Sequence, residues 1–139
     1  VMESATIYRN LLTFFNKKYA ASEKNIYFYS RESDILFIGF DEMTTEIEVK
    51  VGKQDFRRDF SKGEKHNNLS KAYDETDAPN FFYFAAPQGM VSLNDIPEYA
   101  GLIEIKQNGL QKHPKITKKA PLLHSRKLSG EEYKRLYLR

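Results

Sequence analysis

Apolar residues recur at helical spacing near the start of the chain. Residues 3–22 carry an apolar stripe made of Ile7, Leu11, Leu12, Phe14, Phe15 and Tyr19. Positions three and four apart share one face of a helix, so the stripe predicts a helix that packs on a core. Ser4 stands before the stripe, and its hydroxyl is an acceptor of the kind that caps helix N-termini.

Three segments rich in aromatic and β-branched residues follow this helix. Residues 25–30 and 33–40 read NIYFYS and SDILFIGF, compositions that are typical of strands. Residues 45–51 read TEIEVKV, in which charged or polar and apolar residues alternate as they do in a half-buried strand. Residues 41–44, which read DEMT, predict a turn between the last two strands. We therefore expect an antiparallel meander.

The second half of the chain alternates polar and apolar segments. Residues 53–73 are polar and basic, with Phe56 and Phe60 four positions apart, and predict a helix interrupted near Gly63. Residues 78–87 form a nearly continuous apolar run, which predicts a strand buried on both faces rather than a base-stacking surface. The remaining segments predict a short helix or turn, a strand, an extended stretch and a helix capped by Ser129, at residues 92–100, 101–109, 115–124 and 129–139.

This order of elements predicts an α/β fold with a mixed sheet. It contains an αβββαβ core with helices on both faces of the sheet, and the third strand reaches the next one through a helix, as in a right-handed crossover. A chain of 139 residues is expected to form a single domain over residues 1–139.

Composition narrows the classes of protein that fit. The chain has no cysteine, which excludes a disulfide scaffold, a thiolate zinc site and a cysteine nucleophile. No apolar run reaches the roughly 18 residues that span a bilayer, so we expect no membrane association and a cytoplasmic location. The net charge of +3 permits a polyanionic partner without identifying one.

The alternating strand concentrates charge on one face of the expected sheet. Side chains alternate faces in a strand, so Ile47 and Val49 point to the core and Glu46, Glu48 and Lys50 share the other face. From these residues alone, that face is either a solvated surface with Glu–Lys pairs or a binding site.

The hairpin register brings a second carboxylate to this face. A turn centred near residues 41–42 places Asp34 opposite Glu48 or Lys50, with Cβ atoms about 5 Å apart. Two carboxylates this close are retained most readily when a cation lies between them, and oxygen ligands with open positions suit Mg²⁺ or Mn²⁺. A metal-activated water beside a lysine is a combination that can hydrolyse phosphodiester bonds.

These residues resemble a known nuclease superfamily. Asp34, followed after thirteen residues by Glu48-Val49-Lys50, resembles the PD-(D/E)XK pattern, with Ser33 where a proline is usual. The segments VKVGKQDFRRDF, FYFAAPQG, IPEYAGLIEI and KKAPLLH extend the similarity towards the MmcB-like branch and short phage and bacterial proteins. The resemblance covers roughly residues 26–124 and implies a restriction-endonuclease-like core.

The resemblance also implies roles for individual residues. Asp34 and Glu48 would bind Mg²⁺ or Mn²⁺ together with the backbone carbonyl of Val49. Lys50 would orient the attacking water and stabilise developing negative charge. The superfamily often adds a glutamate from the first helix, and Glu3 is the candidate here.

Other charged residues have two readings each. Glu46 shares the face of Glu48 and is either an alternative ligand or a supporting residue behind the ligands. Asp55 and Asp59 are interpreted as charges that favour a helix start rather than as ligands. A group of basic side chains either contacts DNA or forms a solvated surface. Its members are Arg57, Arg58, Lys62, Lys65, His66, Lys118 and Lys119.

The sequence thus predicts a small metal-dependent endonuclease that hydrolyses DNA, encoded by a bacterium or phage and acting in DNA repair, phage DNA processing or defence. The alternative is a catalytically inactive nuclease fold that serves as a DNA-binding or protein-interaction module. A nuclease that acts on RNA is a third reading, because nothing in the sequence distinguishes the 2′-hydroxyl. Two cuts in a duplex need two sites, so a homodimer is expected, or a partner protein that supplies specificity.

Overall fold

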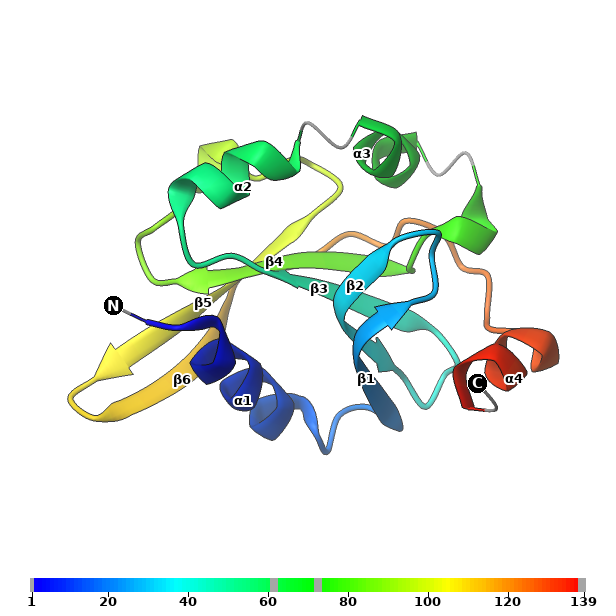
Figure 1. Cartoon of the computed structure of the whole chain (residues 1–139), viewed down its shortest axis with the longest axis horizontal. Coiled ribbons are helices and arrows are strands. Elements are labelled where there is room, and N and C mark those ends of the chain that lie inside the picture. The colour runs from blue at the N-terminus through cyan, green and yellow to red at the C-terminus, as the bar shows by residue number, and fades with distance from the viewer. Residues whose placement is uncertain (1, 61–62, 72–73, 138–139) are drawn as a thin grey trace.

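A six-stranded sheet forms the centre of the computed structural model, which describes residues 2–60, 63–71 and 74–137 (Figure 1). The sheet order is β1-β2-β3-β4-β5-β6. The strands are β1 (Ala21–Tyr27), β2 (Glu32–Ile38), β3 (Thr44–Val49), β4 (Phe81–Pro87), β5 (Gly101–Asn108) and β6 (Gln111–Lys118). The helices are α1 (Ser4–Phe15), α2 (Lys53–Asp59), α3 (Gly63–Lys71) and α4 (Gly130–Tyr137), with 3₁₀ turns η1 (Glu75–Asp77) and η2 (Leu93–Asp95).

The sheet is mixed, as expected. Strands β1, β2 and β3 form an antiparallel meander. The chain then passes through α2 and α3 and returns as β4, which pairs parallel to β3. β5 pairs parallel to β4, and β6 closes the sheet as the second strand of an antiparallel hairpin. The carboxyl ends of β3, β4 and β5 therefore lie at one end of the sheet.

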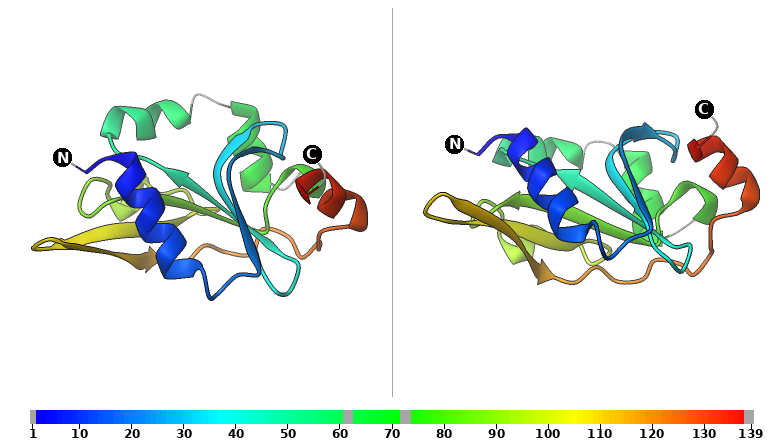
Figure 2. Two further views of the ribbon diagram at one scale, coloured as in Figure 1. Left: turned by 60° about the horizontal axis from the view of Figure 1, so that its bottom comes forward. Right: turned by 90° about the horizontal axis from the view of Figure 1, so that it is seen from below.

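Helices cover both faces of the sheet (Figures 1 and 2). α1 packs its buried residues against one face, where Tyr83 and Ala85 of β4 lie. Phe56 of α2 and Leu69 of α3 belong to the core of the other face. β4 is therefore buried on both faces, as its apolar run predicted. Across the described ranges, no helix is long and apolar enough to cross a bilayer.

Several element boundaries differ from the sequence-based expectation; β6, for example, begins at Gln111, before the extended stretch expected over residues 115–124. The helix expected over residues 3–22 ends at Phe15, and β1 begins at Ala21. Ala21 pairs with Ile38 of β2, so residues that carry no strand signal of their own are extended by pairing with a neighbour. Asn25 adopts φ +52° inside β1, in the left-handed region that asparagine tolerates.

One of the two expected helix caps is confirmed. Ser4 is already helical, and Glu3 takes the N-cap position without a capping side-chain bond. At α4, the Ser129 hydroxyl accepts a bond from the Glu132 N–H at 3.2 Å, and the Glu132 carboxylate accepts one from the Ser129 N–H at 2.9 Å. This reciprocal pair is a capping box.

Hydrogen bonds of the Asn80 side chain connect the segment between β6 and α4 to the sheet. Its Oδ1 accepts a bond from the Thr44 N–H at 2.8 Å. Its Nδ2 donates to the carbonyl oxygens of His124 at 2.8 Å and Arg126 at 2.9 Å. The segment between β6 and α4 lacks regular structure, so these bonds fix its path.

The outer edge of β6 is polar and carries lysines. Lys112 and Lys115 lie on this strand, and Pro114 between them has no N–H to donate. No strand pairs with this edge in the described part of the chain.

Candidate functional site

The hairpin register places Asp34 beside Glu48. Ile35 pairs with Ile47 and Leu36 with Glu46, so one further step sets Asp34 opposite Glu48. Of the two alternatives left open by the sequence, this is the first. The Val49 N–H donates to Asp34 Oδ2 at 2.8 Å, which fixes this carboxylate at the end of β3.

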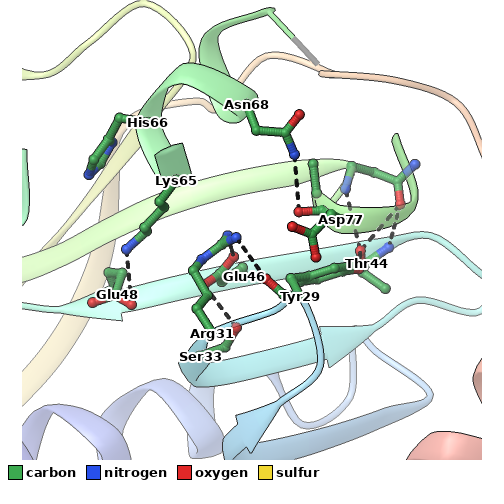
Figure 3. Close-up of polar contacts among 12 residues, drawn as sticks. Tyr29, Arg31, Ser33, Thr44, Glu46, Glu48, Lys65, His66, Asn68 and Asp77 are labelled. Carbon is green, nitrogen blue, oxygen red and sulfur yellow. Dashed lines mark hydrogen bonds and ion pairs between the residues drawn. The ribbon is translucent and has the colours of Figure 1, made fainter. Parts of the chain in front are cut away.

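Glu48 belongs to a ring of four alternating charges. Lys50 Nζ lies 3.6 Å from Glu48 Oε2 and 3.1 Å from Asp59 Oδ1. Lys65 Nζ lies 3.3 Å from Glu48 Oε1 and 3.2 Å from Asp59 Oδ2. Figure 3 shows Lys65 reaching from α3 to Glu48 on β3. We call these four residues, Glu48, Lys50, Asp59 and Lys65, the charge ring.

His66 extends the ring towards the loop before β5. Its Nε2 lies 2.6 Å from Asp59 Oδ2, and its Nδ1 is hydrogen-bonded to the Tyr99 hydroxyl. Asp59 thus meets two ammonium groups and one imidazole. Because Lys65 and His66 are consecutive on α3, this helix supplies two of those three partners.

The surroundings push the pKa values of the two ring carboxylates in opposite directions. Burial raises the pKa of Glu48; the charge of Lys65 opposes this shift, and the charges of Asp34 and Asp59 add to it. Burial also disfavours ionised Asp59, but the His66 hydrogen bond and the two lysines outweigh it and hold the Asp59 pKa well below its usual range. Glu48 is therefore the carboxylate that an added cation would stabilise most.

Lys50 is held in its charged form. Burial lowers its pKa, but the charges of Asp59 and Glu48 raise it more, so the net shift is upward. The backbone N–H of Lys50 donates to the Ala85 carbonyl at 2.8 Å, which ties the residue to β4. The ammonium group thus stands at the end of β3 with little freedom to move.

Glu46 is engaged elsewhere on the same face. It is fully buried, its Oε1 lies 2.5 Å from Arg31 Nη2, and its Oε2 accepts a bond from the Ser33 hydroxyl at 2.9 Å. Figure 3 shows Arg31 over Glu46 and Lys65 over Glu48 as neighbours along β3. Glu46 therefore has a supporting position, and the alternative that made it a substitute ligand does not fit its contacts.

Tyr8, rather than Glu3, reaches the site from α1. Burial and the charge of the neighbouring Asp34 raise the pKa of the Tyr8 hydroxyl. Glu3 is exposed at the start of α1. The residue of the first helix that lies next to Asp34 is thus Tyr8 and not the expected glutamate.

The expected DNA-contacting residues of the second helical region divide into groups. Lys65 and His66 are buried in the site. Arg57 and Arg58 are exposed on α2, where Arg58 pairs with Asp55. Asp55 is in the first turn of α2, as interpreted from the sequence. Lys62 lies outside the described residues.

The structure does not bring Lys118 and Lys119 to the site. Two strands separate β6 from β3. Lys118 pairs with Leu102 at the start of β5, whereas Glu48 is near the carboxyl end of β3, so the two lie at opposite ends of the sheet. Lys118 Nζ instead donates to the Pro97 carbonyl at 2.8 Å.

The sequence interpretation missed Asp59. It ends α2 and is buried at the centre of the charge ring, so its interpretation as a charge that favours a helix start was wrong. A signal was present, since Asp59 lies three residues after Phe56 and such positions share a helix face. Phe56 faces the core, which places Asp59 towards the sheet. Nothing in the sequence pointed to Tyr99.

Two carboxylates at the end of a hairpin are a small donor set. Among the residues the structure describes, no three His, Asp or Glu side chains are grouped to hold a metal ion. Asp34 and Glu48 still provide oxygen ligands of the kind that Mg²⁺ takes, because this ion is usually held by one or two carboxylates and completed by substrate phosphates and water. The residues present therefore fit a metal that binds together with its substrate.

Comparisons with known proteins bear on the fold. The sequence matches no protein-family model and no curated protein. Among solved structures, it is similar to SPO1766, a protein of unknown function from Silicibacter pomeroyi, with a TM-score of 0.68 and 16% sequence identity. The alignment covers 99% of this chain and 83% of that protein. At this identity, the similarity shows a shared fold and nothing about activity.

Proposed function

We propose that this protein is a metal-dependent nuclease of the PD-(D/E)XK type that hydrolyses phosphodiester bonds of DNA. The observation that carries the proposal is the meeting of Asp34, Glu48 and Lys50 at the end of the β2–β3 hairpin. The order α1-β1-β2-β3-α-β4, with β4 parallel to β3, supports a restriction-endonuclease-like core.

A divalent metal, Mg²⁺ or Mn²⁺, would be held by the carboxylates of Asp34 and Glu48 and the carbonyl of Val49. When bound, such an ion lowers the pKa of a coordinated water and neutralises charge on the phosphate. The raised pKa of Glu48 supports this assignment, because a nearby cation would offset the burial of this carboxylate and its repulsion from Asp34 and Asp59.

The lysines of the charge ring suit the remaining tasks. Lys50 can donate to the attacking water, and Asp59 keeps its ammonium charged and oriented. Lys65 adds a second positive charge beside Glu48, where negative charge on a pentacoordinate phosphate would develop. Tyr8, on α1, lies near the Asp34 carboxylate.

Glu48→Gln tests the proposal directly. The parent, with Mg²⁺ or Mn²⁺, is expected to cleave at least one member of a panel of plasmid, blunt duplex, flap, single-stranded DNA and RNA. Glu48→Gln keeps the size of the side chain but removes its charge, so the cleavage rate should fall by at least about a hundredfold. The matched control is Glu131→Gln, an exposed glutamate of α4, which should cut like the parent.

Equal cleavage rates for Glu48→Gln and the control would refute the assignment. If the protein cleaved RNA alone, the proposal of metal-dependent phosphodiester hydrolysis would be retained, and the substrate would be RNA instead of DNA.

The balance of charge in the ring favours a second candidate, a non-catalytic DNA-binding module. Two acidic and two basic residues compensate one another, so the site is stable without a bound ion. A parent protein that binds DNA with strong salt dependence but cuts none of the panel with either metal would support this candidate.

A further inference from the structure

A cavity of about 460 Å³ is lined by residues of α2, by Phe60 and by residues 89–95. Its volume is in the range of about 300–1,000 Å³ that is usual for small-ligand sites. The lining residues come from α2 and from the loop that follows β4, so the cavity lies at the same end of the sheet as the carboxyl ends of β3 and β4.

The rim of the cavity carries two cations for which the described residues supply no partner. Lys53 and Arg57 are four residues apart on α2, so their side chains project on the same side. Both are exposed, and in the described part of the chain neither side chain forms an ion pair or a hydrogen bond. Their neighbour Arg58, by contrast, pairs with Asp55. The two rim cations are therefore available to an anion.

The floor of the cavity is apolar and partly aromatic. Phe56 is buried, and Phe60 and Met90 are half-buried. The Phe60 ring packs 4.8 Å from the His66 ring, measured between centroids. Asp95 adds a carboxylate on the far rim, an acceptor suited to the amino group of a base. Cations beside an aromatic surface are the combination that proteins use to bind single-stranded nucleic acid.

The cavity adjoins the charge ring. His66 packs on Phe60 and also bonds Asp59, so a single residue joins the two sites. Lys53 follows Lys50 by three residues, which is at most about 10 Å of extended chain. Successive phosphates of one strand can therefore contact the ring and the rim.

We propose that this cavity binds one unpaired nucleotide of a DNA strand whose next phosphate lies at the charge ring; the second half of this statement rests on the proposed function. The base lies on Phe60 and Met90, and its phosphate contacts Lys53 and Arg57. A base stacked in a duplex cannot enter, because its faces and pairing edge are occupied. The substrates of this site are then single strands, flaps and frayed ends.

Binding measured without metal tests the cavity separately from cleavage. The probe is a dye-labelled oligodeoxycytidylate of about ten nucleotides, followed by fluorescence anisotropy at neutral pH in EDTA and compared with a blunt duplex. Lys53→Gln/Arg57→Gln should weaken single-strand binding by about tenfold or more and reduce the slope of log K against log salt by about 1.4. Met90→Glu, at a half-buried position, should weaken single-strand binding similarly.

The matched control is Lys17→Gln/Lys127→Gln, which removes two exposed lysines outside the cavity. Blunt-duplex binding by the rim double variant should change no more than it does for this control. If both cavity variants bind the oligonucleotide as the control does, or the parent does not bind it at low salt, the cavity proposal is wrong even if the protein cleaves DNA. If the cavity variants lose binding while no DNA is ever cut, the nuclease proposal fails and the cavity stands.

Discussion

Asp59 stays ionised in a buried position because donors converge on its carboxylate, among them three described side chains. Lys50, Lys65 and His66 replace the water that burial removes. Such a group contributes stability only when all its partners are present, because a single missing partner leaves buried charge uncompensated. The charge ring is therefore expected to respond to substitution as a unit rather than residue by residue.

Asp59→Asn should lower the free energy of unfolding by about 3 kcal/mol at pH 7. The folded-state pKa of Asp59 is depressed, so its stabilisation is present above the unfolded value of about 3.8 and is lost as the pH falls below it. The difference in free energy of unfolding between the parent and Asp59→Asn should therefore become smaller as the pH falls from about 5 towards 2. Urea unfolding at several pH values measures this gap.

Asp55→Asn is the control for this comparison. Asp55 is exposed and pairs with Arg58 across the helix surface, an arrangement worth less than about 1 kcal/mol. A gap for Asp59→Asn that stayed constant from neutral to acid pH would show that its carboxylate is not held ionised by the ring.

At the scale of elements, periodicity predicted the order of helices and strands better than their ends. The alternation in residues 45–51 and the apolar run in 78–87 correspond to β3 and β4, because each reflects which face is buried. β1 starts at Ala21 because backbone pairing with β2 extends it, and pairing with a distant strand leaves little trace in a local pattern.

The candidate site was predictable from the sequence only in part. Asp34, Glu48 and Lys50 lie on one hairpin, so period and register were sufficient to bring them together. Asp59, Lys65 and Tyr99 come from α2, α3 and the loop before β5, and their positions depend on how these elements pack on the sheet. Such placement is a property of the tertiary structure.

The capping box of α4 is a local feature whose contribution to the free energy of unfolding can be measured. Ser129→Ala removes the acceptor for the Glu132 N–H and should reduce the free energy of unfolding by about 1 kcal/mol. Ser125→Ala, at an exposed position outside any helix, should change it by less than half as much. Indistinguishable urea midpoints for the two variants would mean that the box does not stabilise the fold.

At the scale of the whole molecule, Asn80 joins parts that are far apart in the sequence. It bonds the start of β3 and the segment that leads to α4. Because Asn80 is buried, water cannot replace these bonds when its side chain is removed.

Asn80→Ala should therefore cost about 3 kcal/mol and loosen residues 124–137 in particular. Hydrogen exchange would show faster exchange there than in β4, which both faces of the core protect. Asn94→Ala, at an exposed position in η2, serves as the control. Uniform acceleration across the sheet would indicate that Asn80 stabilises the fold globally rather than anchoring the C-terminal segment.

The lysines and proline of β6 also limit how two molecules can meet. An open sheet edge invites a strand from another molecule, and such addition leads from dimers towards aggregates. Lys112 and Lys115 would be brought against the same charges of an identical neighbour, and Pro114 would interrupt the ladder. The homodimer expected from the need for two cuts is therefore not expected to form by strand addition at β6, and the concentrated protein should resist growth by edge-to-edge addition there.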